Sequence, residues 1–220
     1  MKRKTDAQIK HDVSKELLWD TRTWNQGVIV DVEDAVVTLT GSVSTYAQKI
    51  AAQLAAHRVN GVLDVVNELS VRVKERHTDD QIAHAVREAL EWGAFVPDKQ
   101  IKSHVSNGWV RLEGRVNSLS ERSDAEWVVS HLNGVAGVIN EIEINATETD
   151  ATVLRHNIAA ALERRADREA ERLRIDIKDG VVSLYGRVHS WPEREAVVGS
   201  ISHAPGVHKV VDNLRIDPYF

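Results

Sequence analysis

The sequence contains no cysteine, so disulfide bonds, thiol catalysis and cysteine metal sites are all excluded. It also lacks an apolar run of the length that a membrane-spanning helix needs, so we expect no transmembrane segment. The basic start, MKRKTDAQIKHDV, has no apolar stretch behind it, so we expect no signal peptide. These absences predict a cytoplasmic protein, with a periplasmic location as the alternative if a leader has been removed.

A surplus of basic residues is absent as well. The chain of 220 residues has a net charge of −5, and residues 74–149 hold 13 acidic residues against 8 basic ones. A protein that binds nucleic acid carries a basic patch or stripe on its surface. We therefore expect no nucleic-acid partner and no strong attraction to anionic lipid.

Catalytic motifs are missing too. The sequence has neither a G-x-G-x-x-G loop nor a Walker lysine motif, and neither G-x-S-x-G nor H-E-x-x-H occurs. Its acidic side chains alternate with basic ones, as in the run Glu163–Arg172, which we interpret as a solvated helix surface. No nucleophile–base pair or metal-ligand set stands at a recognisable spacing, so we predict no enzyme activity and no cofactor.

The chain instead contains one pattern three times. VVTLTGSV (Val36–Val43) returns as WVRLEGRV (Trp109–Val116) and VVSLYGRV (Val181–Val188), at spacings of 73 and 72 residues. Units of that length can each close a small core of their own. We therefore predict three tandem modules, residues 1–73, 74–147 and 148–220, with short linkers that make a compact or gently curved array.

Two glycines recur in each module. One ends the repeated strand pattern, and the other follows 20 residues later, before a hydrophobic run that closes on an Asx residue. We interpret the first glycine as a backbone position at a strand end and the second as the C-terminal cap of a helix. The first set is Gly41, Gly114 and Gly186, and the second is Gly61, Gly134 and Gly206.

Each module has the same predicted order of elements. Apolar residues four apart predict a first helix, as at Ile9, Val13 and Leu17, with N-caps at Thr5, Thr78 and Asp150. A hairpin of two strands with a two-residue turn, a second helix and a third strand follow. The helix before the third strand makes that strand parallel to one of the others. The predicted fold class is α/β (α+β), with three αββαβ modules, each a mixed three-stranded sheet packed by two helices.

This order carries a resemblance to a known family. The pattern I-x3-V-x3-L, then NG-x-V-x-L-x-G-x-V, then a helix ending in GV-x-x-V-x-N-x-[LI]-x-[VI], resembles the BON domain in three copies over nearly the whole chain. The resemblance implies a non-enzymatic module linked to osmotic or envelope stress and to phospholipid binding. It therefore implies a stress-associated binding or scaffolding protein that contacts phospholipid, envelope components or another protein. A cytoplasmic potassium-binding relative implies the alternative, a small-ligand or ion-binding or assembly module.

Six tryptophans stand against only two phenylalanines. Trp19 and Trp92 occupy equivalent positions at the end of the first helix. Because large aromatic residues are usually mostly buried, we expect both to fill the end of the core, with an interfacial anchor as the alternative. Trp24 and Phe95 lie in irregular segments and are the candidates for exposed contact residues. Trp191 opens the second helix of the third module, where we expect a hydrophobic staple.

Three histidines, His11, His84 and His156, share one position in the first helix of the three modules. Each follows a core residue by two positions, which turns it roughly 200° away from that residue around the helix. We interpret them as surface histidines inherited by duplication. The alternative is a zinc site or a pH-sensitive cluster, which requires a packing of modules that brings the three imidazoles together. The oligomeric state stays open.

Overall fold

The computed structural model describes residues 3–23, 27–72, 77–145, 154, 158 and 173–219. Module 1 contains α1 (Asp6–Trp19), β1 (Gly27–Glu33), β2 (Val36–Val43), α2 (Tyr46–His57), β3 (Asp64–Asn67) and β4 (Ser70–Val71). Module 2 contains α3 (Asp79–Trp92), η1 (Asp98–Gln100), β5 (Ile101–Ser106), β6 (Trp109–Val116), α4 (Leu119–Ser130) and β7 (Gly137–Ile144). In module 3 the described elements are β8 (Arg174–Lys178), β9 (Val181–Val188), α6 (Trp191–Ser202) and β10 (Lys209–Ile216).

The first helices begin where the capping pattern predicts. Thr5 and Thr78 each accept a hydrogen bond from the backbone N–H of a glutamine three residues later, and that glutamine side chain accepts one from the N-cap backbone in return. This capping box satisfies two N–H groups that a helix start would otherwise leave unpaired. The third predicted N-cap, Asp150, lies outside the described residues.

The hairpin turns also follow from their residue types. Both residues of each turn have positive φ values, between 48° and 76°, as a type I′ turn requires. In module 1 the Asp6 carboxylate accepts the N–H groups of Asp34 and Ala35 at 3.1 and 2.9 Å. In module 2 Asp79 accepts those of Asn107 and Gly108 at 2.8 and 2.9 Å. The first helix therefore holds the tip of the hairpin in both modules.

Each module has its own mixed sheet, and the fold prediction is confirmed. β1 pairs antiparallel with β2, β5 with β6, and β8 with β9. The last strand of each module then pairs parallel with the middle one: β3 and β4 with β2, β7 with β6, and β10 with β9. No strand pairing joins two modules within the described residues.

The Asx residue of each last strand ties it to the second helix. Asn67 donates to the Lys49 carbonyl at 2.9 Å, and Asn140 donates to the Arg122 carbonyl at 3.1 Å. In module 3 the equivalent residue is Asp212, which accepts from the Arg194 side chain at 2.7 Å. The Asx oxygen also accepts a backbone N–H two residues later, and in module 1 the strand is interrupted at this point into β3 and β4.

The second helices end earlier than predicted. α2 ends at His57, and its C-cap is Arg58 in a right-handed helical conformation rather than Gly61. The other two second helices likewise have His131 and His203 as C-caps. The glycines Gly61, Gly134 and Gly206 instead complete the following turn, where their φ values are 100°, 88° and 90°. The prediction of a glycine C-cap was wrong by three residues because the turn itself occupies those positions.

The three modules close into a ring through the first residue of each second helix. Tyr46 of module 1 packs against the core of module 2, and Leu119 of module 2 packs against the core of module 3. Trp191 of module 3 packs against the core of module 1. These three residues are spaced by 73 and 72 positions, like the repeat itself. One equivalent contact therefore recurs at every junction, and the last one closes the circle.

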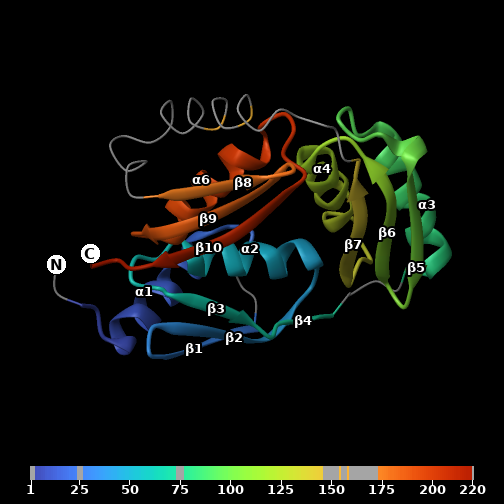
Figure 1. Cartoon of the computed structure of the whole chain (residues 1–220). Coiled ribbons are helices and arrows are strands. Elements are labelled where there is room, and N and C mark those ends of the chain that lie inside the picture. Colours follow the sequence, from blue (N-terminus) through green and yellow to red (C-terminus); the bar gives the residue numbers. More distant parts are fainter. Residues whose placement is uncertain are drawn as a thin grey trace.

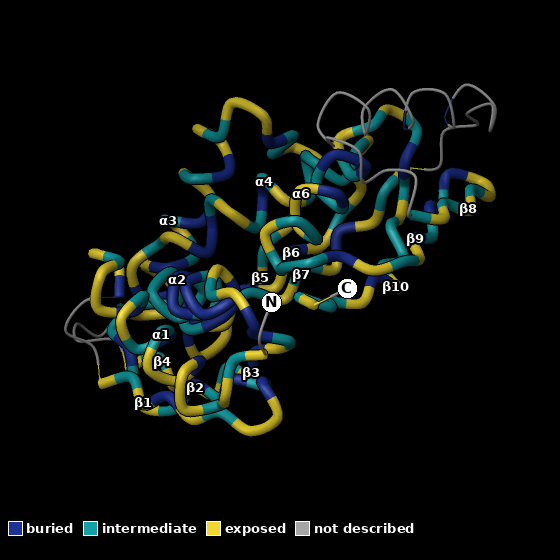
Figure 2. Tube along the Cα trace, turned by 90° about the vertical axis from the view of Figure 1, so that its left-hand side faces the viewer, coloured by how far each residue is buried: buried dark blue, intermediate teal, exposed yellow. Residues whose placement is uncertain are grey.

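The closed ring places the three modules side by side and brings the two ends of the chain together. In Figure 1 module 1 occupies the lower left, module 2 the right and module 3 the upper left. In Figure 2 α2 is coloured dark blue and teal, without an exposed residue, and Ala51, Ala52, Ala55, Ala56 and His57 are its buried residues. The start of module 1 meets the end of module 3, where the Lys4 N–H donates to the Tyr219 hydroxyl at 3.0 Å. In the described part of the chain, none of the helices has the length and apolarity to cross a membrane.

Candidate functional site

The two equivalent tryptophans at the ends of the first helices are exposed. The exposed fraction is 86% for Trp19 and 87% for Trp92, so the prediction that they fill the core was wrong. Leu17 and Leu90 are the last core residues of these helices instead. Each tryptophan follows its leucine by two positions and is therefore turned roughly 200° away from the core. Large aromatic surface of this kind, held in water at two equivalent places, marks a candidate contact site.

A second exposed apolar residue accompanies each tryptophan. Leu18 is 65% exposed in module 1, and Phe95 is 79% exposed in module 2. We call Leu18, Trp19, Trp92 and Phe95 the helix-end apolar residues. Phe95 is exposed, as expected for a contact residue, whereas the other candidate of that kind, Trp24, lies outside the described residues.

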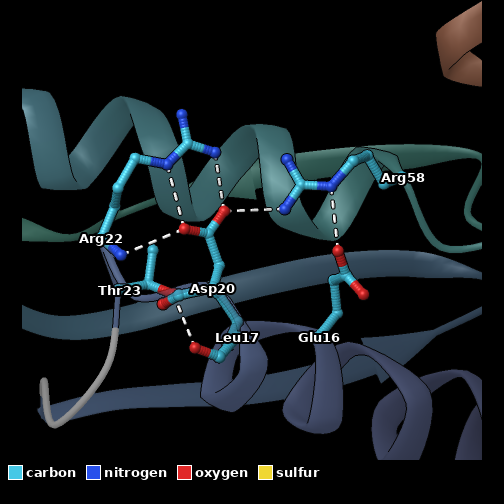
Figure 3. Close-up of polar contacts among 6 residues, drawn as sticks. All are labelled: Glu16, Leu17, Asp20, Arg22, Thr23 and Arg58. Carbon is cyan, nitrogen blue, oxygen red and sulfur yellow. Dashed lines mark hydrogen bonds and ion pairs between the residues drawn. The ribbon is translucent and has the colours of Figure 1, made fainter.

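The end of α1 is held by a network of ion pairs, drawn in Figure 3. Asp20, the C-cap of α1, accepts two hydrogen bonds from the Arg22 guanidinium at 2.9 and 2.7 Å and one from Arg58 at 2.8 Å. Arg58 also donates to Glu16 at 2.9 Å, which joins the ends of α1 and α2. The hydrogen bond from Arg22, helped by that from Arg58, holds the pKa of Asp20 far below its ordinary value although burial opposes the shift. The carboxylate is therefore charged, and the helix end that carries Trp19 is fixed.

The end of α3 is fixed by packing rather than by charge. Gly93, the C-cap, donates its N–H to Ala89, and Val96 donates its N–H to the Gly93 carbonyl at 2.9 Å. Val96 is only 9% exposed and belongs to the core of module 2. The short turn between the helix and this buried valine leaves Phe95 directed outward. Both pairs of helix-end apolar residues are therefore presented from rigid elements.

The junction between modules 3 and 1 contains a stacked aromatic pair. The Trp191 ring lies 3.8 Å from the His57 ring with an interplanar angle of 10°, and its Nε1 donates to the Leu63 carbonyl at 3.2 Å. Trp191 therefore packs on another module, and the predicted staple within its own helix was wrong. The contact depends on how modules meet, which the helix pattern does not contain. The shared apolar character of positions 46, 119 and 191 is the signal that could have found it.

His57 is buried at this junction without a polar partner. Its side chain is only 6% exposed, and neither ring nitrogen has a hydrogen-bond partner among the residues that the structure describes. Burial lowers the pKa of His57 to about 4; nearby Asp64 opposes the shift and Arg194 adds to it. The imidazole is therefore neutral at neutral pH, and it serves as an apolar stacking surface for Trp191.

Two of the three repeated histidines of the first helices lie on the surface. His11 is exposed, and His84 is exposed with its ring 4.0 Å from Asp80. His156 lies outside the described residues, so the structure does not compare all three positions. Among the residues that it does describe, no group of three or more His, Asp or Glu side chains could hold a metal ion.

The glycines predicted at the strand ends lie inside the middle strands, two residues before the last residue of each, and they have a backbone role. Gly41 and Gly114 have φ values of 111° and 142°, and a Cβ on them would collide with the carbonyl oxygens of Gly27 and Gln100. Gly186, their counterpart in module 3, has a φ of 140°. These residues let the middle strand approach the start of the first strand closely.

Known proteins resemble this chain over a large part of its length. Osmotically-inducible protein Y of Escherichia coli (strain K12) is 28% identical over 144 residues, which is 63% of this chain and 72% of that protein. An uncharacterised protein in the gshII 5′ region of Anaplasma centrale is 29% identical over 136 residues, 59% of this chain and 88% of that protein.

Two solved structures of CdsD, a structural protein of the type III secretion system of Chlamydia trachomatis, also match. They are 13% and 14% identical and each covers 94% of this chain, with 91% and 96% of their own chains covered. Their TM-scores are 0.28 and 0.27. The family model of the BON domain, in contrast, matches residues 5–73, 78–146 and 150–218. The chain therefore belongs to the BON domain family, with three copies of the domain in one ring.

Proposed function

We propose that this chain is a non-enzymatic, stress-associated binding and scaffolding protein that contacts phospholipid surfaces through its helix-end apolar residues. The observation that carries the proposal is the exposure of Trp19 and Trp92, 86% and 87%, at one equivalent position of two modules. Similarity to a protein named for osmotic induction supports the stress-associated part. The three modules supply the scaffold.

Tryptophan has a physical reason to leave water at a membrane surface. Its ring is apolar but carries one N–H donor, so it is most stable at the boundary between lipid and water. At about 25 cal/mol per Å² of apolar surface removed from water, one deeply inserted ring contributes roughly 2–4 kcal/mol. Two rings therefore supply enough free energy for weak, reversible attachment, the range of a single lipid anchor.

The charge of the chain defines the kind of attachment. With a net charge of −5, the protein gains no overall attraction to an anionic membrane. Attachment through the helix-end apolar residues then rests on apolar insertion, which salt does not screen. We expect binding to zwitterionic vesicles that persists when the salt concentration is raised.

Co-sedimentation with phosphatidylcholine vesicles tests the proposal. The variant Trp19→Ala/Trp92→Ala should leave the vesicle pellet, since it removes both rings from the helix ends. The control variant Trp109→Ala/Trp127→Ala removes two rings that are 50% and 63% exposed elsewhere, and it should sediment like the unaltered chain. Equal loss of binding in both variants, or no binding by the unaltered chain, would contradict the proposal.

A further inference from the structure

A cavity of about 620 Å³ lies where module 1 meets module 3. Module 1 lines it with the segment before α1 and with two turns, and module 3 lines it with the ends of β9 and β10. The volume falls within the range of roughly 300–1,000 Å³ that small-molecule sites occupy. We call this cavity the seam pocket.

The seam pocket is basic although the chain as a whole is acidic. Its lining includes Arg3, Lys4, Arg187 and Arg215 but only one carboxylate, Asp217. Lys4 pairs with a carboxylate outside the lining at 2.7 Å, and Arg187 lies 3.4 Å from Asp217. Arg3 and Arg215 make no ion pair or hydrogen bond with any residue in the described ranges. About two positive charges therefore remain without a counter-charge in the pocket.

Two of these arginines face each other on paired strands, and Asp217, which pairs with Arg187, is the single carboxylate of the lining beside them. Arg187 on β9 lies directly opposite Arg215 on the neighbouring strand β10. Like charges directly opposite each other on paired strands are destabilising. In module 2 the equivalent pair is Arg115 opposite Glu143, which form an ion pair at 3.0 Å.

In module 1 the pair of residues at the equivalent position is also neutral. There the equivalent residues are Ser42 and Ser70, which lie opposite each other on β2 and β4. The opposite residues are therefore neutral as a pair in modules 1 and 2, whereas in module 3 Asp217 offsets Arg187 and Arg215 has no counter-charge among the described residues. An anion beside Arg215 would supply the counter-charge that this pair of strands lacks.

We propose that the seam pocket binds a phosphate monoester, with Arg187 and Arg215 of module 3 and Arg3 of module 1 around the phosphate. A guanidinium matches phosphate oxygens with two parallel donors, and the two uncompensated charges equal those of a dianionic monoester. Apolar residues on the remaining wall, Leu63, Ile216 and Pro218, face the organic part of the ligand. Because the phosphate contacts both modules, binding also stabilises the junction. The site does not involve the helix-end apolar residues.

The phosphate monoester has two possible sources, a soluble metabolite or the headgroup of phosphatidic acid. Glycerol 3-phosphate represents the first and vesicles of phosphatidylcholine with added phosphatidic acid represent the second. A soluble source predicts a rise in melting temperature with glycerol 3-phosphate, compared with sodium chloride at equal ionic strength. A lipid source predicts co-sedimentation that increases with phosphatidic acid. Either response supports the site, and the absence of both overturns it.

The variant Arg215→Glu tests the residues. It recreates the Arg–Glu pair of module 2, so its melting temperature without ligand should equal or exceed that of the unaltered chain, while the response to phosphate monoester disappears. The matched control is Lys209→Glu, an exposed residue on the same strand with the same change of charge and no part in the lining. It should keep the response.

A second variant, Arg3→Ala, removes one cation without touching a strand and should weaken the response. A response that Arg215→Glu retains, or that Lys209→Glu also loses, would overturn the proposal, since the effect would then come from the overall charge. The variant Trp19→Ala/Trp92→Ala should keep the response to glycerol 3-phosphate. This outcome separates failure of the seam pocket from failure of attachment through tryptophan.

Discussion

Because the three modules form a closed ring, we predict that Trp191 stabilises the whole chain and not only its own module. Replacing Trp191 by alanine removes the stack on His57 at 3.8 Å, the hydrogen bond to the Leu63 carbonyl at 3.2 Å and the apolar contact with the core of module 1. Stacking contributes about 1 kcal/mol, and the hydrogen bond contributes a further ~1 kcal/mol. The half-buried ring loses apolar burial as well, so we expect a total loss of about 3 kcal/mol, the low end for a buried tryptophan.

Urea unfolding at neutral pH, with linear extrapolation to zero denaturant, measures this loss. The control is Trp127→Ala, which removes a ring that is 63% exposed and should cost about 0.5 kcal/mol or less. Limited proteolysis gives a second reading, because an open junction exposes the turn around Leu63 to cleavage. If Trp191→Ala is as stable as Trp127→Ala, the junction between modules 3 and 1 does not contribute to the stability of the chain, and the prediction is wrong.

Three further predictions concern stability. Burial lowers the pKa of His57 to about 4, whereas in the unfolded chain this pKa is about 6.5. The contribution of neutral His57 to the free energy of unfolding is therefore complete above about pH 6.5 and is lost as the pH falls towards 4. This loss is on the order of 3 kcal/mol, and His57→Gln should flatten that part of a urea-unfolding pH profile. Asp20→Ala leaves Arg22 and Arg58 without their shared carboxylate and should cost about 1–3 kcal/mol by thermal unfolding; no change would show that the network is irrelevant. Gly114→Ala should lower the free energy of unfolding by about 2 kcal/mol or more, measured by calorimetry. The control is Gly199→Ala in α6, where a Cβ meets nothing within 4 Å, and it should raise that free energy by about 0.5–1 kcal/mol. The reverse order would contradict a backbone role of Gly114.

The fold could be predicted because the sequence pattern of one module occurs three times in the chain. The capping boxes at Thr5 and Thr78, the two-residue turns and the spacing of core residues are all local patterns, and their recurrence at 73 and 72 residues separates them from chance. Local patterns also determine the parallel pairing of the last strand, since a helix must cross over before it. The end of α2 was predicted less well because helix ends depend on the turn that follows.

The candidate site was predicted less well for two different reasons. The error at Trp19 and Trp92 came from the general tendency of tryptophan to be buried. The spacing from Leu17 and Leu90 already indicates the outward direction. The stack of Trp191 on His57 and the seam pocket depend on how three modules meet, which no pattern within one module contains. For the arginine pair, comparison of Arg215 with Glu143 and Ser70 reveals an unusual charge, but the cavity beside it requires the structure.

Quenching of tryptophan fluorescence by brominated phosphatidylcholine tests whether Trp19 and Trp92 enter the lipid surface, as proposed. Bromine on the acyl chain quenches only rings that reach the membrane. The variants Trp19→Phe/Trp92→Phe and Trp109→Phe/Trp127→Phe each keep four of the six tryptophans. We predict strong quenching of the unaltered chain and of the second variant, and little quenching of the first. Equal quenching of both variants, or none in any of the three proteins, would contradict insertion of these two rings.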